Sequence, residues 1–283
     1  MVPTFFLLSG YLFYQNFAYS ELKRKWKSRL FSLVIPYCIW NVIAYFYYEI
    51  IYNIPAISSH INQSIEPFSA GNLIRNVLWG YHNITWFLRY LIVYTFTVPF
   101  LYPVIKRKRI GVIFIILLSV VNHYYDIGGV GYLRYGIIYL IGAWIGCNLT
   151  DVVRKKYNLE APSIIYLFFS TIIASIIPTL IHKDLYNAIR VSQAIAIWLL
   201  ADIFYTDRKP KWWMKISFFI YCSHSIVLES LEKIILIIFG KNQIGATIDF
   251  IIASPVTICI IIGAAWIIQK YPLLWKVLSG NRR

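Results

Sequence analysis

The stretch Thr247–Gln269, TIDFIIASPVTICIIIGAAWIIQ, is the clearest guide to the fold of this chain. Apart from Asp249 near its start it carries no charged side chain. It is also long enough to cross a hydrocarbon layer, which takes about 20 apolar residues. Backbone groups find no water in that layer and must bond within a helix. The stretch therefore predicts a membrane-spanning helix.

Runs of similar length and character recur along the rest of the chain. The spans that we predict are Val2–Ala18, Leu30–Ile51, Trp86–Ile105, Ile110–Tyr125, Tyr132–Leu149, Ser163–Ile181, Tyr186–Phe204, Ile216–Phe239 and Thr247–Gln269. No internal repeat or low-complexity tract interrupts them. We therefore predict one all-α, polytopic membrane domain over residues 1–283, with about nine transmembrane helices.

The composition agrees with a membrane protein. Hydrophobic residues make up 59% of the chain and charged residues 14%, whereas a soluble domain has a charged fraction of about 25%. The net charge of +15, from 27 Lys and Arg against 12 Asp and Glu, would ordinarily raise nucleic acid as a partner. These charges lie almost entirely between the apolar runs, so we expect membrane lipid as the partner and no nucleic acid.

The basic residues also predict an orientation. They gather after the first, third, fifth, seventh and ninth runs, whereas the opposite loops hold only Arg75, Lys183 and Lys241. Because cytoplasmic loops are enriched in Lys and Arg, the first group is expected to be cytoplasmic. The sequence thus predicts a cytoplasmic C-terminus and a multi-pass protein of a bacterial inner or plasma membrane.

Five short stretches, in this order, carry a resemblance to a known family. They are PTFFLLSGYLF at 3–13, LVIPYCIW at 33–40, WFLRYLI at 86–92, YLIGA at 139–143 and SFFIYCSH at 217–224. By these stretches the chain resembles acyltransferase family 3, integral-membrane enzymes that O-acylate, usually O-acetylate, surface polysaccharides and related glycans. The resemblance implies transfer of an acyl group from acyl-coenzyme A, usually acetyl-CoA, to a sugar hydroxyl. It implies acyl-CoA as a donor substrate and no permanently bound cofactor.

The family's first helix carries an Arg and a His, and that His is regarded as the catalytic base. The present sequence begins at what resembles the second helix. None of its five histidines matches that position by motif. The resemblance therefore implies an N-terminally incomplete domain, and an inactive one if the first helix is truly lacking.

The predicted span Ile216–Phe239 holds the candidates for catalysis on the acceptor side. At about 1.5 Å per residue, His224 and Glu229 lie roughly 12 and 20 Å from its cytoplasmic end, where an ionisable side chain is by default functional. A His can accept a hydroxyl proton. The alternatives are a packing role for His224 and a structural pair between Glu229 and Lys233, one turn apart. Tyr221, next to His224, is a candidate for substrate binding.

Three arginines stand near the outer ends of separate predicted spans, namely Arg89, Arg134 and Arg190. They either snorkel to the headgroups or line an outward cavity that binds substrate. For Arg89 we favour the cavity and a catalytic role, since the stretch that begins at Trp86 recurs in a subgroup of the family. Trp86, Arg134 and Arg190 are then candidates for binding the acceptor.

The basic stretch Lys23–Arg29 offers a donor site. Arg24 and Arg29 suit the phosphates of acyl-CoA, and Arg29 matches a family position. The alternative is an anchor beside anionic lipid, to which each charge contributes about 1 kcal/mol.

A different class of function is also open at this stage. Intramembrane Arg and Glu side chains could line the route of a transporter or flippase for a glycan precursor or small anion. The sequence shows no inverted repeat with paired Gly/Pro-broken segments, which counts against that class. A third alternative is an inactive fragment that acts only as a partner.

Overall fold

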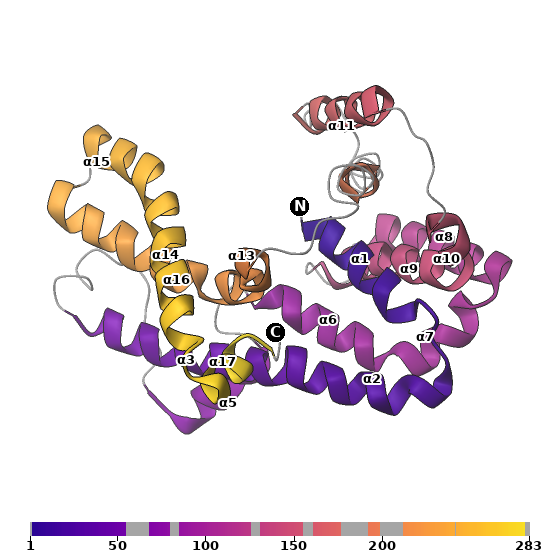
Figure 1. The fold of residues 1–283 in the computed structure, drawn as a ribbon, viewed down its shortest axis with the longest axis horizontal. Helices are drawn as coiled ribbons and strands as arrows, with labels where there is room; N and C mark the ends of the chain where they lie inside the picture. The colour runs from indigo at the N-terminus through magenta and orange to yellow at the C-terminus, as the bar shows by residue number, and fades with distance from the viewer. Residues whose placement is uncertain are drawn as a thin grey trace. The chain divides into compact units, whose positions relative to one another are not determined.

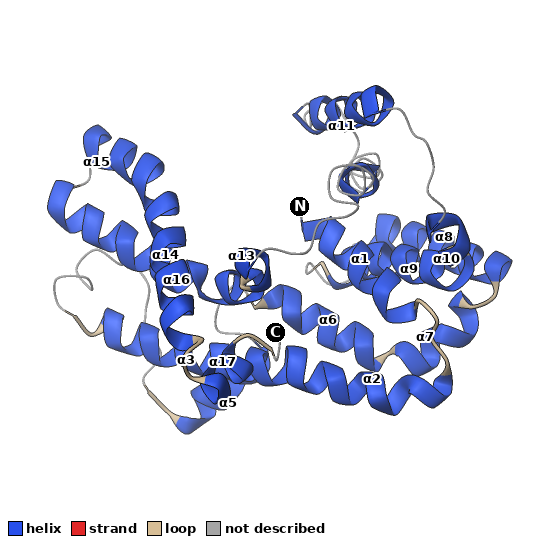
Figure 2. Ribbon diagram, in the orientation of Figure 1, coloured by secondary structure: helices blue, strands red, loops and turns tan. Residues whose placement is uncertain are grey.

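The computed structural model describes residues 2–54, 68–79, 85–125, 131–154, 161–176, 192–198, 212–240 and 242–280. Within these ranges every regular element is helical and none is a strand (Figure 2). The all-α prediction is thus confirmed for the part of the chain that the structure describes. Most of the expected seventh span, Tyr186–Phe204, lies outside the described residues.

The chain divides into two compact units, Met1–Arg24 with Val93–Lys209 and Lys25–Ile92 with Pro210–Arg283 (Figure 1). The first unit contains α1 (Val2–Tyr14), η1 (Tyr19–Glu21), α7 (Val98–Ile105), α8 (Lys108–Tyr125), α9 (Tyr132–Asn148), α10 (Thr150–Arg154) and α11 (Ala161–Ile176). The second contains η2 (Leu30–Val34), α3 (Ile35–Tyr52), α5 (Ala70–Trp79), α13 (Trp212–Lys215), α14 (Ser217–Phe239), α15 (Gln243–Ile248), η3 (Asp249–Ala253), α16 (Ser254–Ile268) and α17 (Pro272–Leu278). Helices α2 (Leu22–Arg29) and α6 (Trp86–Phe96) have residues in both units.

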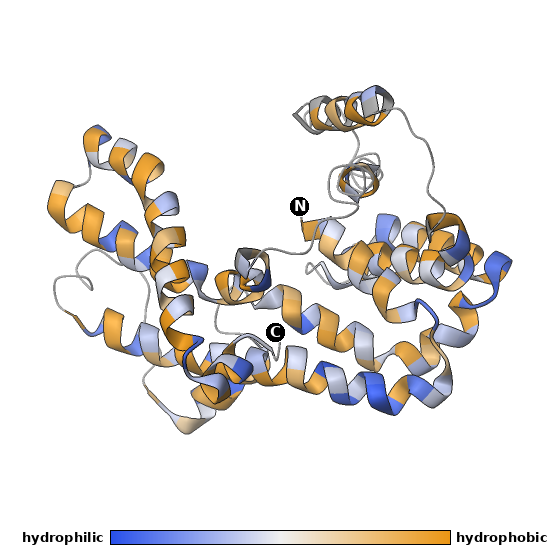
Figure 3. Cartoon of the chain, in the orientation of Figure 1, coloured by the Kyte–Doolittle hydropathy of each residue, from blue (hydrophilic) through white to orange (hydrophobic). Residues whose placement is uncertain are grey.

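Two helical stretches among the described residues have the length and apolar composition of a membrane span. They are Tyr19–Ile51, which includes α2, η2 and α3, and Gln243–Ile268, which joins α15, η3 and α16. A third is obtained if α6 and α7, bent by 68° at a short break, count as one span. In the hydropathy colours of Figure 3, α16 is mostly hydrophobic, whereas α2 is mostly hydrophilic. These helices make the chain a membrane protein.

The sequence missed one continuous helix. We expected the basic stretch Lys23–Arg29 to connect two spans, but it forms α2, which continues through the π-helical turn η2 into α3. Both π-helical turns, η2 and η3, end two residues before a proline, Pro36 and Pro255. Since proline has no N–H for the carbonyl four residues earlier, the helix has to rearrange at that point.

Prolines also break the expected straight span Trp86–Ile105. Pro99 stands in the first turn of α7, directly after the bend, and Pro103 lies inside α7. Pro103 has no N–H to donate to the carbonyl of Pro99. The hydroxyl of Tyr19 donates to that carbonyl instead, at 3.1 Å. A side chain therefore replaces the backbone hydrogen bond that the proline removes.

Close contact between α1 and α9 forms the centre of the first unit. A Cβ added at Gly10 would overlap the carbonyl oxygen of Tyr139, and one at Gly142 would overlap that of Leu7. One at Gly146 would lie 2.6 Å from a carbonyl oxygen of α1. Small residues let membrane helices approach this closely. Gly10, Gly142 and Gly146 therefore allow α1 and α9 to pack backbone against backbone.

In the second unit, α3 is tied to α17 and α5 by side-chain hydrogen bonds to backbone carbonyls. Trp40 Nε1 donates to the carbonyl of Leu278 at 3.1 Å, and the Tyr37 hydroxyl donates to that of Leu78 at 3.1 Å. Each bond satisfies a carbonyl near the C-terminal end of a helix, where no intrahelical donor remains. These contacts fix the face of α3 that carries the site described below.

Candidate functional site

His224 lies half-buried in α14, and its contacts define which ring nitrogen is available. Its Nδ1 is 2.7 Å from the carbonyl oxygen of Tyr221 and 3.2 Å from that of Ile220. A carbonyl oxygen can only accept, so Nδ1 carries the proton in this arrangement. In the neutral ring Nε2 then holds the lone pair. His224 therefore has a nitrogen that can accept the proton of a hydroxyl.

Aromatic side chains connect His224 to the start of α6. The ring of Tyr221 lies 6.2 Å from that of His224 and meets Phe87 edge to face at 5.7 Å. Phe87 in turn adjoins Trp86, which packs edge to face on Tyr90 at 5.2 Å. Two of the predicted substrate-binding residues, Trp86 and Tyr221, are thus brought to one aromatic cluster.

Glu229 is held by two hydroxyl groups. Tyr48 of α3 donates to one carboxylate oxygen at 2.8 Å, and Ser225 donates to the other at 3.2 Å. Beside this pair, the hydroxyls of Tyr47 and Ser230 lie 2.6 Å apart. Hydrogen bonds to a charged acceptor contribute about 1.5–3 kcal/mol. These contacts fix the orientation of Glu229. We call the set of Tyr47, Tyr48, Ser225, Glu229 and Ser230, between α3 and α14, the polar seam.

Further charges surround this seam. Lys233 interacts electrostatically with Glu229 and Glu232, and its Nζ lies 5.8 Å from the centre of the Tyr48 ring. Glu232 is exposed and faces the charge of Asp249. The expected proximity of Lys233 to Glu229 is present. No described hydrogen bond joins Glu232 to the hydroxyls that hold Glu229.

Arg89 has a definite local partner. Its guanidinium donates to the carbonyl of Trp79, the last residue of α5, and lies 5.8 Å from the centre of the Tyr90 ring. A cation at the C-terminal end of a helix is stabilised by the free carbonyls there. The guanidinium has five N–H donors, so a partner on one side does not exhaust its capacity to bind a ligand.

A buried polar pair lies near the aromatic cluster and was not predicted. Asn41 is 0% exposed; its amide donates to the carbonyl of Tyr37 at 2.8 Å, and its oxygen accepts from Thr85 at 2.9 Å. Thr85 directly precedes Trp86. The pair therefore fixes the start of α6 against α3, which positions Trp86 and its neighbours.

Comparison with known proteins identifies the family of the chain as a whole. A family model for an acyltransferase domain, that of acyltransferase family 3, matches residues 1–269. The chain belongs to acyltransferase family 3. Neither the search of curated proteins nor that of solved structures gives a match. Family membership makes this a membrane acyltransferase and does not favour the transporter alternative.

The predicted donor-side arginines of this acyltransferase have different surroundings. Arg24 forms an ion pair with Glu21, one turn away, and is largely exposed. Arg29, the last residue of α2, is half-buried. The ion pair partly balances the charge of Arg24, and Arg29 is the candidate that matches a family position.

The other two predicted arginines are not brought to the α14 site by any described contact. Arg134 belongs to the first unit, where its Nε is buried and has no hydrogen-bond partner among the described residues. Arg190 lies outside the described residues. Among the described ranges, no three His, Cys, Asp or Glu side chains gather as metal ligands.

Sequence reasoning missed Tyr48, which stands 181 residues from its partner Glu229. A signal was present. Tyr37, Asn41, Tyr45 and Tyr48 recur at helical spacing in an otherwise apolar run, so they mark one polar face of α3. The sequence does not show which helix packs against this polar face of α3.

Proposed function

We propose that this protein is an O-acyltransferase that moves an acyl group, usually acetyl, from acyl-CoA to a sugar hydroxyl of a surface polysaccharide or related glycan. It is a multi-pass protein of the cell membrane, with about nine spans and a cytoplasmic C-terminus. Family membership over residues 1–269 supports the reaction class. The polar seam of α14 supports the chemistry at the acceptor.

We assign the proton transfer to His224, since none of the five histidines matches by motif the one that the family uses as base. The acceptor hydroxyl gives its proton to Nε2 of His224 while its oxygen attacks the carbonyl carbon of the thioester. The carbon–sulfur bond then breaks, and the sulfur of CoA leaves with the proton that His224 held. The observation that carries this role is the Nδ1 contact with the carbonyl of Tyr221, which leaves Nε2 as the basic nitrogen.

The neighbouring residues orient the acceptor and stabilise charge. Trp86 and Tyr221 provide ring faces for the sugar, and Glu229 accepts a hydrogen bond from one of its hydroxyls. Arg89 stabilises the negative charge that develops on the carbonyl oxygen, in the manner of an oxyanion hole. Arg24 and Arg29 bind the phosphates of the donor.

The direct test is acetyl transfer by membranes that contain the full chain. Radiolabelled acetyl-CoA is supplied with a polysaccharide acceptor, and label in the polysaccharide is measured after alkali-sensitive release. Transfer above that of membranes without the chain supports the proposal. Transfer that survives the combined changes His224→Ala and Arg29→Ala would show that these assignments are wrong.

Loss of Arg29 is expected to weaken donor binding. Arg29→Ala should raise the KM for acetyl-CoA about tenfold, which is 1.4 kcal/mol, and leave kcat nearly unchanged. Arg29→Lys should recover part of the loss, because a point charge replaces the planar fork. Arg24→Ala is the matched control and should have the smaller effect, since Glu21 already pairs with Arg24. Equal effects of the two alanine variants would contradict the assignment.

Loss of the Glu229 charge is expected to slow acyl transfer, because the acceptor is bound and oriented less well. Glu229→Gln should raise the acceptor KM and reduce kcat, together about tenfold or more in kcat/KM. Tyr48→Phe should give part of that loss, and the two changes should be non-additive because the groups share a 2.8 Å hydrogen bond. Glu232→Gln, on the same helix but exposed, is the control. A loss as large in Glu232→Gln would point to a general effect of charge.

A further inference from the structure

The C-terminal helix α17, Pro272–Leu278, lies beyond the residues that the family model matches, yet it packs into the second unit. The ring of Trp275 lies 5.5 Å from that of Phe219 near the start of α14, and Phe219 meets Trp40 of α3 edge to face at 5.6 Å. Trp40 donates in turn to the carbonyl of Leu278. Helix α17 therefore connects the N-terminal parts of α3 and α14, the two helices that form the polar seam.

The end of α17 fits closely against the turn between α2 and α3. Gly280, at φ +70°, has the left-handed backbone that commonly follows a helix. A Cβ at this position would lie 2.7 Å from the carbonyl oxygen of Ser32 in η2. Leu278 is 7% exposed and Ser279 is 0% exposed. This face of α17 is thus covered by its own unit.

The opposite face of α17 and the turn before it are apolar and basic. Leu273 is 82% exposed, Leu274 48% and Tyr271 63%, and Lys270 and Lys276 are also exposed. We call these five residues the exposed face. Such a combination is typical of a helix that lies at the surface of a bilayer, with its apolar side chains among the acyl chains and its lysines at the headgroups.

The connection to α16 places α17 at such a surface. The candidate span Gln243–Ile268 ends four residues before Pro272, and four residues of chain reach at most about 14 Å. The connection is also folded, because the backbone N–H groups of Lys270 and Tyr271 bond back to the last turn of α16. The Nζ of Lys270 lies 4.0 Å from the centre of the Trp266 ring, and tryptophan is enriched where a span meets the headgroups. Helix α17 therefore begins at the level of the headgroups.

We propose that α17 is a membrane-surface clamp, whose exposed face binds anionic phospholipid while its buried face holds α3 and α14 together. Lys270 and Lys276 select an anionic lipid, since each basic residue near an anionic surface strengthens binding about fivefold. Leu273 and Leu274 insert among the acyl chains. Bound lipid thereby stabilises the packing behind the polar seam. The inference does not depend on acyl transfer, so it can be tested on a chain without activity.

The first test identifies what covers the exposed face. In the full chain, Leu273→p-benzoylphenylalanine introduces a photoreactive group, and the protein is placed in nanodiscs of phosphatidylcholine with a small share of phosphatidylglycerol. After illumination, mass spectrometry should find lipid adducts, with phosphatidylglycerol about fivefold above its share of the bilayer. Adducts to a second copy or to another segment of the chain would overturn the inference. A share of phosphatidylglycerol equal to that of the bilayer would do the same.

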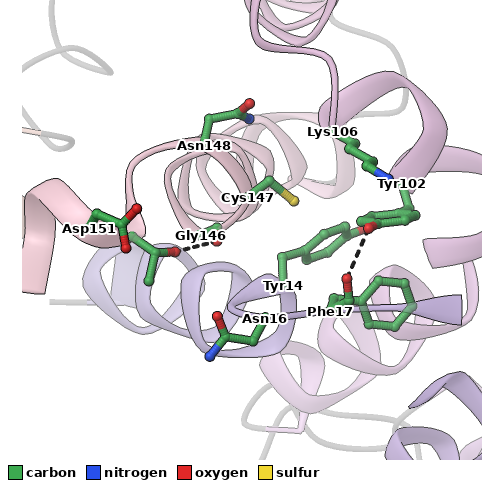
Figure 4. Close-up of a pocket in the computed structure, with 10 residues that line it drawn as sticks. Tyr14, Asn16, Phe17, Tyr102, Lys106, Gly146, Cys147, Asn148 and Asp151 are labelled. Atoms are coloured by element: carbon green, nitrogen blue, oxygen red, sulfur yellow. Dashed lines mark hydrogen bonds between the residues drawn. The ribbon is translucent and has the colours of Figure 1, made fainter. Parts of the chain in front are cut away.

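Two pairs of charge changes locate the selectivity. Lys270→Gln with Lys276→Gln should return phosphatidylglycerol to its bulk share, while lipid adducts as a whole persist through the apolar contacts. The matched control, Lys106→Gln with Lys108→Gln, removes two exposed charges from the first unit and should leave the selectivity unchanged. Figure 4 shows Lys106 beside Tyr102, with its Nζ 5.7 Å from the centre of that ring. An equal loss in both pairs would assign the effect to net charge and overturn the inference.

The second test measures whether the lipid contact stabilises the helices behind α17. A partner that binds only the folded state raises Tm, so phosphatidylglycerol in the nanodisc should raise the Tm of the wild-type chain. The part of this rise that Lys270→Gln with Lys276→Gln removes is the contribution of α17. Trp40→Phe keeps a ring but loses the donor to Leu278, and it should abolish most of that contribution.

The matched control for Trp40 is Trp144→Phe. Trp144 Nε1 donates to the carbonyl of Lys108 at 3.0 Å in the first unit, so this variant loses a bond of the same kind away from α17. It should lower Tm without changing the contribution of α17. If the two tryptophan variants keep the same contribution, α17 binds lipid without holding α3, and the clamp is overturned.

The photochemical test is independent of these Tm values.

Discussion

Gly142→Ala is expected to destabilise the protein, although alanine is ordinarily the better helix former by about 1 kcal/mol. The added Cβ would overlap the carbonyl oxygen of Leu7 and lie 3.1 Å from its Cα. These are backbone atoms, which cannot rotate out of the way as a side chain can. Overpacking of this kind costs about 1–3 kcal/mol. The measurement is Tm of the purified full chain in detergent, with the fraction that stays monodisperse.

The matched control is Gly263→Ala in α16. A Cβ at Gly263 meets nothing within 4 Å, so the variant should keep or slightly raise Tm. The comparison removes helix propensity from the result, because both glycines lie inside helices. Equal changes in Tm for the two variants would show that α1 and α9 do not meet at Gly142.

His224→Gln is expected to reduce kcat for acetyl transfer by about 100-fold or more, which is the usual contribution of a general base. Glutamine keeps a donor and an acceptor of similar size but has no basic nitrogen. The KM for acetyl-CoA should change little, since His224 acts on the acceptor hydroxyl. Initial rates at saturating donor, with donor KM measured in parallel, separate the two constants.

The control for this change is His123→Gln at the exposed end of α8. It removes one imidazole without touching α14 and should leave kcat and Tm unchanged. A His224→Gln variant with normal kcat would assign His224 to packing. A lower Tm together with lost activity would call for comparison at a temperature where both proteins are folded.

The sequence predicted the helical character of the chain because long apolar runs permit no other structure in a membrane. It placed α14 and the start of α6 within a residue of their observed bounds. The prediction was wrong at Lys23–Arg29. We expected a loop there because the stretch is charged, although every residue in it is tolerated in a helix. The prediction of a straight span was also wrong at Pro99 and Pro103, because prolines kink helices.

The site was predicted in part. His224, Glu229 and Trp86 stand out because polar or interfacial residues are rare in such runs. Tyr48 and Thr85 do not, since a tyrosine or threonine in an apolar run is ordinary, and their roles depend on which helices meet. Glu229 contacts Tyr48 across 181 residues of sequence, and Thr85 contacts Asn41 across 44. Which residues pair in this way depends on the tertiary packing of the helices, which the sequence pattern does not show.

The hydrogen bond from Tyr19 to the carbonyl of Pro99 has a consequence for the order of synthesis. A carbonyl released by Pro103 has no partner in its own helix and would enter the membrane unsatisfied. Its donor lies 80 residues earlier in the chain, and chains fold from the N-terminus as they are made. The ribosome therefore completes Tyr19 before the bent helix emerges, so that the bend can form against a partner already in place.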